Sequence, residues 1–281
     1  MTLFDSMVAD FRARTTTERD NAIHETMQEI ALAGLSRGGF FEKAVFCGGT
    51  CLHLFHGLDR FSEDLDFSLL APDRAFRFEP FFDAVREEFR LAGKQIEILA
   101  KRKARPTNVE SAFLKETSDV YDIGFSTEKR IKVKLEVDVL PPPGLRTEMK
   151  ILLRPSSRWI RAYDLPGLFA GKVHAVLFRK WKTRIKGRDW YDFAWYVARG
   201  VALDLPHLRA RAAQTDPDVD LSTPDALAAA LDARIDAIDF AAARLDVEPF
   251  VSDPSALSIW SRDYFKAVVR QMKFAPSPPS A

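Results

Sequence analysis

Two aspartates, Asp64 and Asp66, have the type and spacing needed to hold a divalent metal ion. They lie in RFSEDLDFSLL, where polar and apolar residues alternate as in a half-buried strand. Residues two apart in a strand point to the same side, about 6.5–7 Å apart at Cα, so both carboxylates share one face with Ser62. Because like charges at this distance repel, an oxygen-preferring cation, most simply Mg²⁺, is the expected counter-ion.

A glycine turn precedes this strand. Gly48, Gly49 and Thr50 lie between the apolar stretch EKAVFC and TCLHLFHGL, a segment of helical length. Glycines here let backbone N–H groups approach a phosphate, and the helix N-terminus adds a favourable potential. Alone, a Gly-Gly-Thr is usually an ordinary turn and an Asp-x-Asp pair a solvated strand edge. Their combination predicts a site for a metal-bound nucleoside triphosphate.

The clearest strand pattern is KRIKVKLEVDVL, residues 129–140, in which apolar and charged residues alternate. Its polar face offers a third carboxylate, either Glu136 or Asp138, to a metal site that supports in-line displacement. Lys134 shares that face and is placed to meet a phosphate oxygen. An exposed polar face with alternating charges is the other interpretation of the same pattern.

The densest basic run in the chain covers residues 179–188, of which six are Lys or Arg. It ends in Arg188-Asp189, and Asp192 follows on the same helical face as Asp189. A basic patch beside a triphosphate pocket suits a nucleic-acid acceptor, although a solvated helical face would look the same. Lys172 is the kind of point charge that stabilises a transferring phosphoryl group.

Composition limits the remaining possibilities. The chain has 281 residues, and its 41 Lys and Arg nearly balance its 40 Asp and Glu, so any nucleic-acid surface must be local. We expect the two cysteines, Cys47 and Cys51, to be buried thiols, and the aromatics of 190–196 to lie in the core. No secretory leader or membrane span is evident, which predicts a cytoplasmic protein without membrane contact. The absence of Gly-x-Ser-x-Gly and Walker motifs disfavours a serine hydrolase and a P-loop ATPase.

The distribution of patterns predicts a mixed α/β part followed by a helical part. We expect an α/β domain over residues 1–150 and a helical domain over 151–274 that carries the late basic and acidic residues. A Pro- and Ser-rich tail, 275–281, is expected to be disordered.

Four stretches resemble the motifs of one family, the AbiEii/AbiGii-type toxin nucleotidyltransferases of type IV toxin–antitoxin and abortive-infection systems. GGTCLHLFHGLDRFSEDLDF resembles the first motif, and KLE at 134–136 resembles the second, Lys-x-Glu. AGKVHAVLFR, with Lys172, is similar to the third, and KGRDWYDFAWYV to the fourth, Arg-Asp-x-x-Asp. The four occur in order over residues 46–197.

The resemblance implies a DNA polymerase β-like nucleotidyltransferase core with a mixed sheet, followed by a helical part. It implies Mg²⁺-dependent transfer of a nucleotide from an NTP, with tRNA ends as acceptors in characterised relatives such as mycobacterial toxins. By motif position, Ser62, Asp64 and Asp66 would form the triphosphate–metal centre, Lys172 would bind phosphate and Asp189 would belong to the essential late motif. Glu136 is the third carboxylate by motif, while Asp138 is equally well placed by strand parity.

These observations together predict a toxin that transfers NMP from an NTP to an RNA acceptor, at a tRNA 3′ end, and so arrests translation. Lys172 and Arg188 would neutralise developing charge, and a neighbouring gene would encode an antitoxin. One alternative keeps the enzyme but makes the acceptor a protein or small-molecule hydroxyl. Another is a non-catalytic module that binds a nucleotide or a partner.

Overall fold

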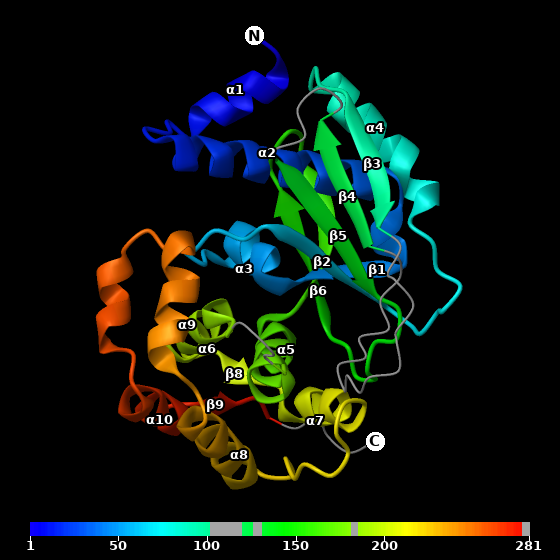
Figure 1. Ribbon diagram of the computed structural model, residues 1–281. Coiled ribbons are helices and arrows are strands. Elements are labelled where there is room, and N and C mark those ends of the chain that lie inside the picture. The colour runs from blue at the N-terminus through cyan, green and yellow to red at the C-terminus, as the bar shows by residue number, and fades with distance from the viewer. Residues whose placement is uncertain (102–119, 126–130, 181–184, 277–281) are drawn as a thin grey trace.

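A mixed seven-stranded β-sheet is the centre of the protein (Figure 1). The structure, a computed structural model, describes residues 1–101, 120–125, 131–180 and 185–276. The strand order is β3-β4-β5-β2-β1-β7-β6, in which β2–β5 and β1–β7 are parallel and the other pairs antiparallel. The strands are β1 (Ala44–Cys47), β2 (Asp64–Leu69), β3 (Ile96–Lys101), β4 (Val120–Phe125), β5 (Lys132–Asp138), β6 (Thr147–Leu152) and β7 (Arg158–Tyr163).

Helices α2 and α4 lie beside the sheet, while α5 to α10 gather in the lower half of Figure 1. The helices are α1 (Leu3–Asp10), α2 (Thr16–Arg37), α3 (Gly48–His56), α4 (Phe82–Leu91), α5 (Leu165–Phe178), α6 (Gly187–Ala198), α7 (Leu205–Ala213), α8 (Pro224–Asp236), α9 (Phe240–Val247) and α10 (Arg262–Arg270). Short 3₁₀ helices are η1 (Phe40–Glu42), η2 (Glu79–Phe81), η3 (Glu248–Phe250) and η4 (Pro254–Ile259). A second small sheet pairs β8 (Ala202–Leu203) with β9 (Lys273–Phe274).

Alternation along the central strands separates the core from the polar face. In β5, Val133, Leu135 and Val137 are fully buried, as the sequence pattern predicts. They pack with Phe67 of β2 and Phe40 in a cluster of buried aromatic rings. Since each such side chain contributes about 1.5–3 kcal/mol on burial, this face of the sheet anchors the fold and leaves the opposite face to polar residues.

Several predicted elements are found with changed limits. The helical pattern over residues 4–37 is divided into α1 and α2, with a break at Arg12, whose φ is 51°. Gly57, with φ 73°, ends α3 as its position suggested. The sheet extends past residue 150 through β6 and β7, so that the change to helix comes at α5.

The predicted division into two domains at residue 150 stays a prediction. Residues 277–281 of the predicted tail and residues 181–184 of the basic run lie outside the described residues. Within the part that is described, no helix has the length and apolar character to cross a membrane.

Candidate active site

The register of β2 against β5 brings four charged side chains to one face of the sheet. The parallel pairing places Asp64 opposite Lys134 and Asp66 opposite Glu136. Residues directly opposite each other share a face, so the Asp-x-Asp pair and the Lys-x-Glu pair form one group. Two strands far apart in the sequence thus supply the residues that their spacing suggested.

The glycine turn closes directly against this group. Gly48 follows β1 with φ 80°, in the left-handed region that favours glycine, and α3 begins there. A Cβ atom on Gly48 would overlap the Asp66 carboxylate, and one on Gly49 would lie 2.8 Å from both Arg60 Nη2 and Ser62 Oγ. Both positions therefore need glycine for the N-terminus of α3 to lie this close to Asp66 and Ser62.

Thr50 and Gln28 hold the start of β2 in place. The fully buried Thr50 hydroxyl donates to the Asp64 carbonyl oxygen at 2.6 Å. Gln28 Nε2 of α2 donates to the carbonyl oxygen of Ser62 at 2.9 Å. The Thr50 side chain therefore ties the glycine turn to the backbone of the aspartate strand.

The carboxylates influence each other strongly. Burial, followed by the neighbouring charges of Asp66 and Glu136, raises the pKa of Asp64 to about 6, although Lys134 opposes the shift. Lys134 Nζ lies 2.8 Å from Glu136 Oε1. Burial lowers the pKa of Lys134, but the hydrogen bond to Glu136 and the nearby aspartates raise it further, so the net shift is upward. The face carries more negative charge than one lysine balances.

This donor set fits a divalent cation. The two aspartates supply hard oxygen ligands, and a cation between them would remove the repulsion that raises the pKa of Asp64. Among the described residues, no three His, Cys, Asp or Glu side chains are grouped as a metal site. We therefore expect Asp64 and Asp66 to be the first ligands of a cation, because Glu136 is ion-paired with Lys134.

The structure places the two candidates for the third carboxylate in different surroundings. Glu136 is the register partner of Asp66, whereas Asp138 pairs with Ser68 further along β2. Asp138 is buried, lies 2.5 Å from Arg211 Nη1 of α7 and accepts a hydrogen bond from Leu140 N. The geometry therefore favours Glu136 as the third carboxylate, while Asp138 joins the sheet to α7.

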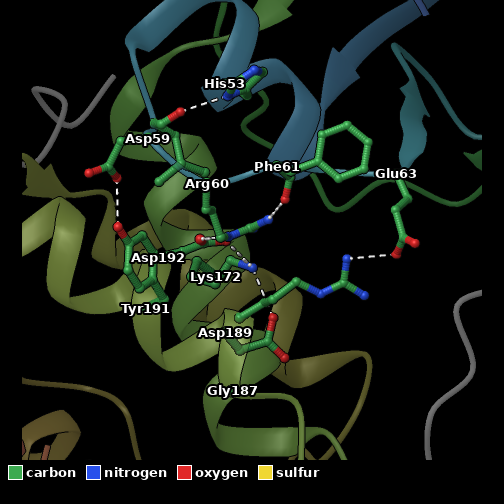
Figure 2. Close-up of polar contacts among 12 residues, drawn as sticks. His53, Asp59, Arg60, Phe61, Glu63, Lys172, Gly187, Asp189, Tyr191 and Asp192 are labelled. Atoms are coloured by element: carbon green, nitrogen blue, oxygen red, sulfur yellow. Dashed lines mark hydrogen bonds and ion pairs between the residues drawn. The ribbon is translucent and has the colours of Figure 1, made fainter. Parts of the chain in front are cut away.

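The late motif forms a buried ion network (Figure 2). Lys172 Nζ of α5 lies 2.8 Å from both Asp189 Oδ1 and Asp192 Oδ2 of α6. Arg60 binds Asp192 through Nε and Nη2, each at 2.6 Å, and Arg179 pairs with Asp189. Burial opposes the ionised form of Asp189, but Lys172 and Arg179 outweigh it and lower its pKa to about 2. The phosphate-binding role that the resemblance gives to Lys172 stays a prediction.

The sequence patterns did not single out Arg60 and Arg179. Arg60 lies within the first-motif stretch, yet its partner Asp192 is 132 residues away. Its guanidinium also lies against Gly49, so the network supports the glycine turn. The only signal for Arg60 in the sequence was its place within that stretch, which by itself does not identify the residue it binds.

Arg188 connects the beginning of α6 to the aspartate strand. Its Nη1 lies 3.0 Å from Glu63 Oε2, next to Asp64, and its guanidinium lies 4.1 Å from the ring centre of Phe250. Lys180, next to Arg179, and Lys186, two residues before Arg188, have exposed side chains. Neighbouring protein atoms partly desolvate the Lys186 ammonium and, with the charge of Arg179, lower its pKa, while Asp189 and Asp64 act in the opposite direction. Cations therefore border the carboxylate face.

Two further expectations are met in part. Trp190, Phe193 and Tyr196 are buried core residues of α6, whereas Tyr191 and Trp195 are only partly buried and pack against the core. Cys51 is a fully buried thiol, and Cys47 is partly buried.

A glycine turn beside paired aspartates on a mixed sheet fits a nucleotidyltransferase. The chain belongs to the family described as "Nucleotidyl transferase AbiEii toxin, Type IV TA system", which matches residues 30–271. The resemblance and the fold class are confirmed, and the protein is an enzyme of the toxin–antitoxin class, which implies an NTP substrate and an antitoxin partner.

Two solved structures are similar to the chain. MenT4, a nucleotidyltransferase toxin from Mycobacterium tuberculosis, shares the fold at 18% identity and a TM-score of 0.59, over 97% of this chain and 91% of that one. JHP933 from Helicobacter pylori is similar at 18% identity and a TM-score of 0.48, over 89% and 90% of the two chains. No curated protein matches the sequence.

Proposed function

We propose that this nucleotidyltransferase uses Mg²⁺ to transfer NMP from an NTP to an RNA acceptor, namely the 3′ end of a tRNA, and thereby blocks translation. The observation that carries the proposal is the pair Asp64 and Asp66, closed on one side by Gly48 and neighboured by Glu136. This arrangement provides oxygen ligands next to a turn whose N–H groups can donate hydrogen bonds to a polyphosphate.

The residues have distinct tasks in the proposed transfer. The bound cation would polarise the triphosphate, while the backbone N–H groups at Gly48 and Gly49 orient it. The acceptor hydroxyl oxygen forms a bond to the α-phosphorus, and the bond to the pyrophosphate oxygen breaks. Glu136, hydrogen-bonded to Lys134, is the nearby carboxylate suited to accept the hydroxyl proton.

The charge distribution supports a nucleic-acid acceptor. Because acidic and basic residues nearly balance over the chain, binding to a polyanion needs a local positive surface. The exposed Lys180 and Lys186, with Arg188 between α6 and β2, provide positive charge beside the carboxylate face. An RNA strand lying there would bring its terminal hydroxyl toward Asp64 and Asp66.

The first prediction tests the transfer itself. Asp64→Asn removes a metal-binding oxygen charge, so labelling of RNA from an α-labelled NTP should fall at least about 100-fold. The matched control is Asp83→Asn on α4, where the side chain is 96% exposed, and it should label RNA like the unchanged protein. Chelation should abolish labelling and Mg²⁺ should restore it.

The acceptor is tested in the same assay. Periodate oxidation of the RNA 3′ diol should abolish labelling, because no terminal hydroxyl pair remains to attack. Label that survives RNase and follows protein or small molecules would contradict an RNA acceptor. Unchanged labelling by the Asp64→Asn variant would refute the assignment of the site.

A further inference from the structure

Strand β6 is an open edge of the sheet. It is the last strand of the seven, and within the described ranges it pairs only with β7. An edge strand directs unpaired N–H and C=O groups outward, so another extended strand can add to the sheet there. Natural edges are usually protected by charges, bulges or covering loops.

One face of this edge exposes large apolar side chains. Met149 and Ile151 alternate along β6 and are 47% and 48% exposed, and Leu153 continues the pattern at 74%. Trp159 of β7 is the register partner of Ile151 and is 59% exposed. Four such residues on one face form a contiguous apolar surface, which is typical of an interaction site.

The other face of β6 carries one acidic and one basic residue. Glu148 and Lys150 are two residues apart, on either side of Met149, with Lys150 Nζ 3.0 Å from Glu148 Oε1. A two-fold axis through Met149 and perpendicular to the sheet would pair β6 with a second β6 in antiparallel orientation. Glu148 of each copy would then lie opposite Lys150 of the other, so the strand is complementary in charge to itself.

We propose that two copies of this chain associate through antiparallel pairing of their β6 strands, with Met149 on the two-fold axis. The pairing continues the sheet from one copy into the other and satisfies the outward backbone groups. In this register, odd-numbered residues of one copy lie opposite odd-numbered residues of the other, so the apolar faces of the two strands lie on the same side of the joined sheet. Met149 lies opposite Met149, and Ile151 lies opposite Thr147. An axis through Ile151 would oppose Lys150 with Leu152 and would not form the charge pairs.

Cysteine cross-linking tests the register. Met149→Cys should give a disulfide-linked dimer on mild oxidation, because directly opposed residues have Cα atoms about 4.5–5.5 Å apart. Ile151→Cys should not, because the two copies of this residue would be offset by about 13 Å along the strands. The unchanged protein, with its native Cys47 and Cys51, gives the background.

Cross-linking at Ile151 but not at Met149 would overturn the register. Neither cross-link, together with a monomer mass by light scattering at high protein concentration, would overturn the dimer.

Charge exchange provides an independent test that does not depend on new thiols. Glu148→Lys alone places lysine opposite lysine at two symmetric positions, so the dimer dissociation constant should rise about tenfold. The double variant Glu148→Lys with Lys150→Glu restores opposite charges and should recover the original constant, as measured by sedimentation equilibrium. Equal weakening by the single and double variants would contradict the pairing.

A final comparison tests whether the β6 edge, rather than another exposed apolar residue, forms the dimer interface. Ile151→Asp should give a monomer, whereas Leu245→Asp on α9, at a residue 71% exposed, should leave the dimer intact. Circular dichroism and melting temperature verify that both variants are folded. A dimer that survives Ile151→Asp and dissociates with Leu245→Asp would place the interface elsewhere.

Discussion

The ionised Asp64 side chain lowers the stability of the folded protein. Its folded-state pKa of about 6 exceeds the ordinary value of 3.8, because burial and the charges of Asp66 and Glu136 disfavour the ionised form. Between these two values the folded chain holds the proton more tightly than the unfolded chain, so stability falls as pH rises from about 4 to 6. Above pH 6 the full penalty remains. A functional carboxylate is thus retained against the stability of the fold.

The second prediction follows from this destabilising effect of ionised Asp64. At pH 8 without divalent metal, Asp64→Asn should raise the free energy of unfolding by about 2–3 kcal/mol, measured by urea denaturation. Near pH 4 the difference should shrink, because the folded wild-type carboxyl is protonated, and saturating Mg²⁺ at pH 8 should also reduce it. Asp83→Asn serves as the exposed control. An Asp64→Asn variant less stable than wild type at pH 8 would contradict the electrostatic description.

Individual residues differ in how far the sequence reveals them. Asp64, Asp66 and the glycine turn are apparent because their spacing is local and their chemistry is specific. Arg60 is not, because its carboxylate partner is 132 residues away and no local pattern records that interaction. The choice between Glu136 and Asp138 also needed the register of β2 and β5, since both have the correct parity.

At the level of elements, α5 and α6 are joined by one partly buried ammonium, that of Lys172. Lys172 Nζ holds Asp189 and Asp192 together, and both carboxylates are buried. Removing the lysine would leave Asp189 with Arg179 alone and Asp192 with Arg60 alone. Each lost hydrogen bond to a charged group costs about 1.5–3 kcal/mol. A structural role for Lys172 therefore predicts a loss of stability when the residue is replaced, whereas the phosphate-binding role implied by the resemblance predicts a loss of transfer activity.

The third prediction separates these roles. Lys172→Met should lower the free energy of unfolding by about 3–5 kcal/mol, in contrast to Lys180→Met just past the end of α5, where the side chain is exposed. Urea denaturation followed by tryptophan fluorescence measures both. A Lys172→Met variant with wild-type stability but little transfer activity would instead favour direct contact with the triphosphate.

Elements were predictable where their patterns were clean. The alternation in β5 gave a strand with the correct buried face. The strands β6 and β7 were not predicted from the sequence. TEMKIL does alternate polar and apolar residues, but its apolar Met149 and Ile151 are exposed while Glu148 and Lys150 are partly buried, the reverse of a usual half-buried strand. The same departure from pattern marks β6 as the surface on which we base the dimer.

At the scale of the whole molecule, the helical part and the sheet are connected at the site. Arg60 bonds to Asp192 (Figure 2), and Arg188 bonds to Glu63, so α6 is bound to the chain on both sides of Ser62. The composition could not reveal this connection, because it suggested only a mixed region followed by a helical one. The arrangement places Arg188, and with it positive charge at the start of α6, beside the residue that precedes the aspartate strand.

The last prediction concerns these cations as a surface. Because each neutralised phosphate releases counterions, replacing Lys180 and Lys186 with Gln should weaken tRNA binding and reduce the salt dependence by about one unit of slope for each phosphate that is no longer neutralised. Fluorescence anisotropy over a range of salt concentrations measures both, in an Asp64→Asn background that prevents turnover. Lys43→Gln, an exposed lysine that precedes β1 at the end away from the glycine turn, is the matched control. An unchanged slope in the double variant, with weaker binding in the control, would place the RNA on another face of the protein.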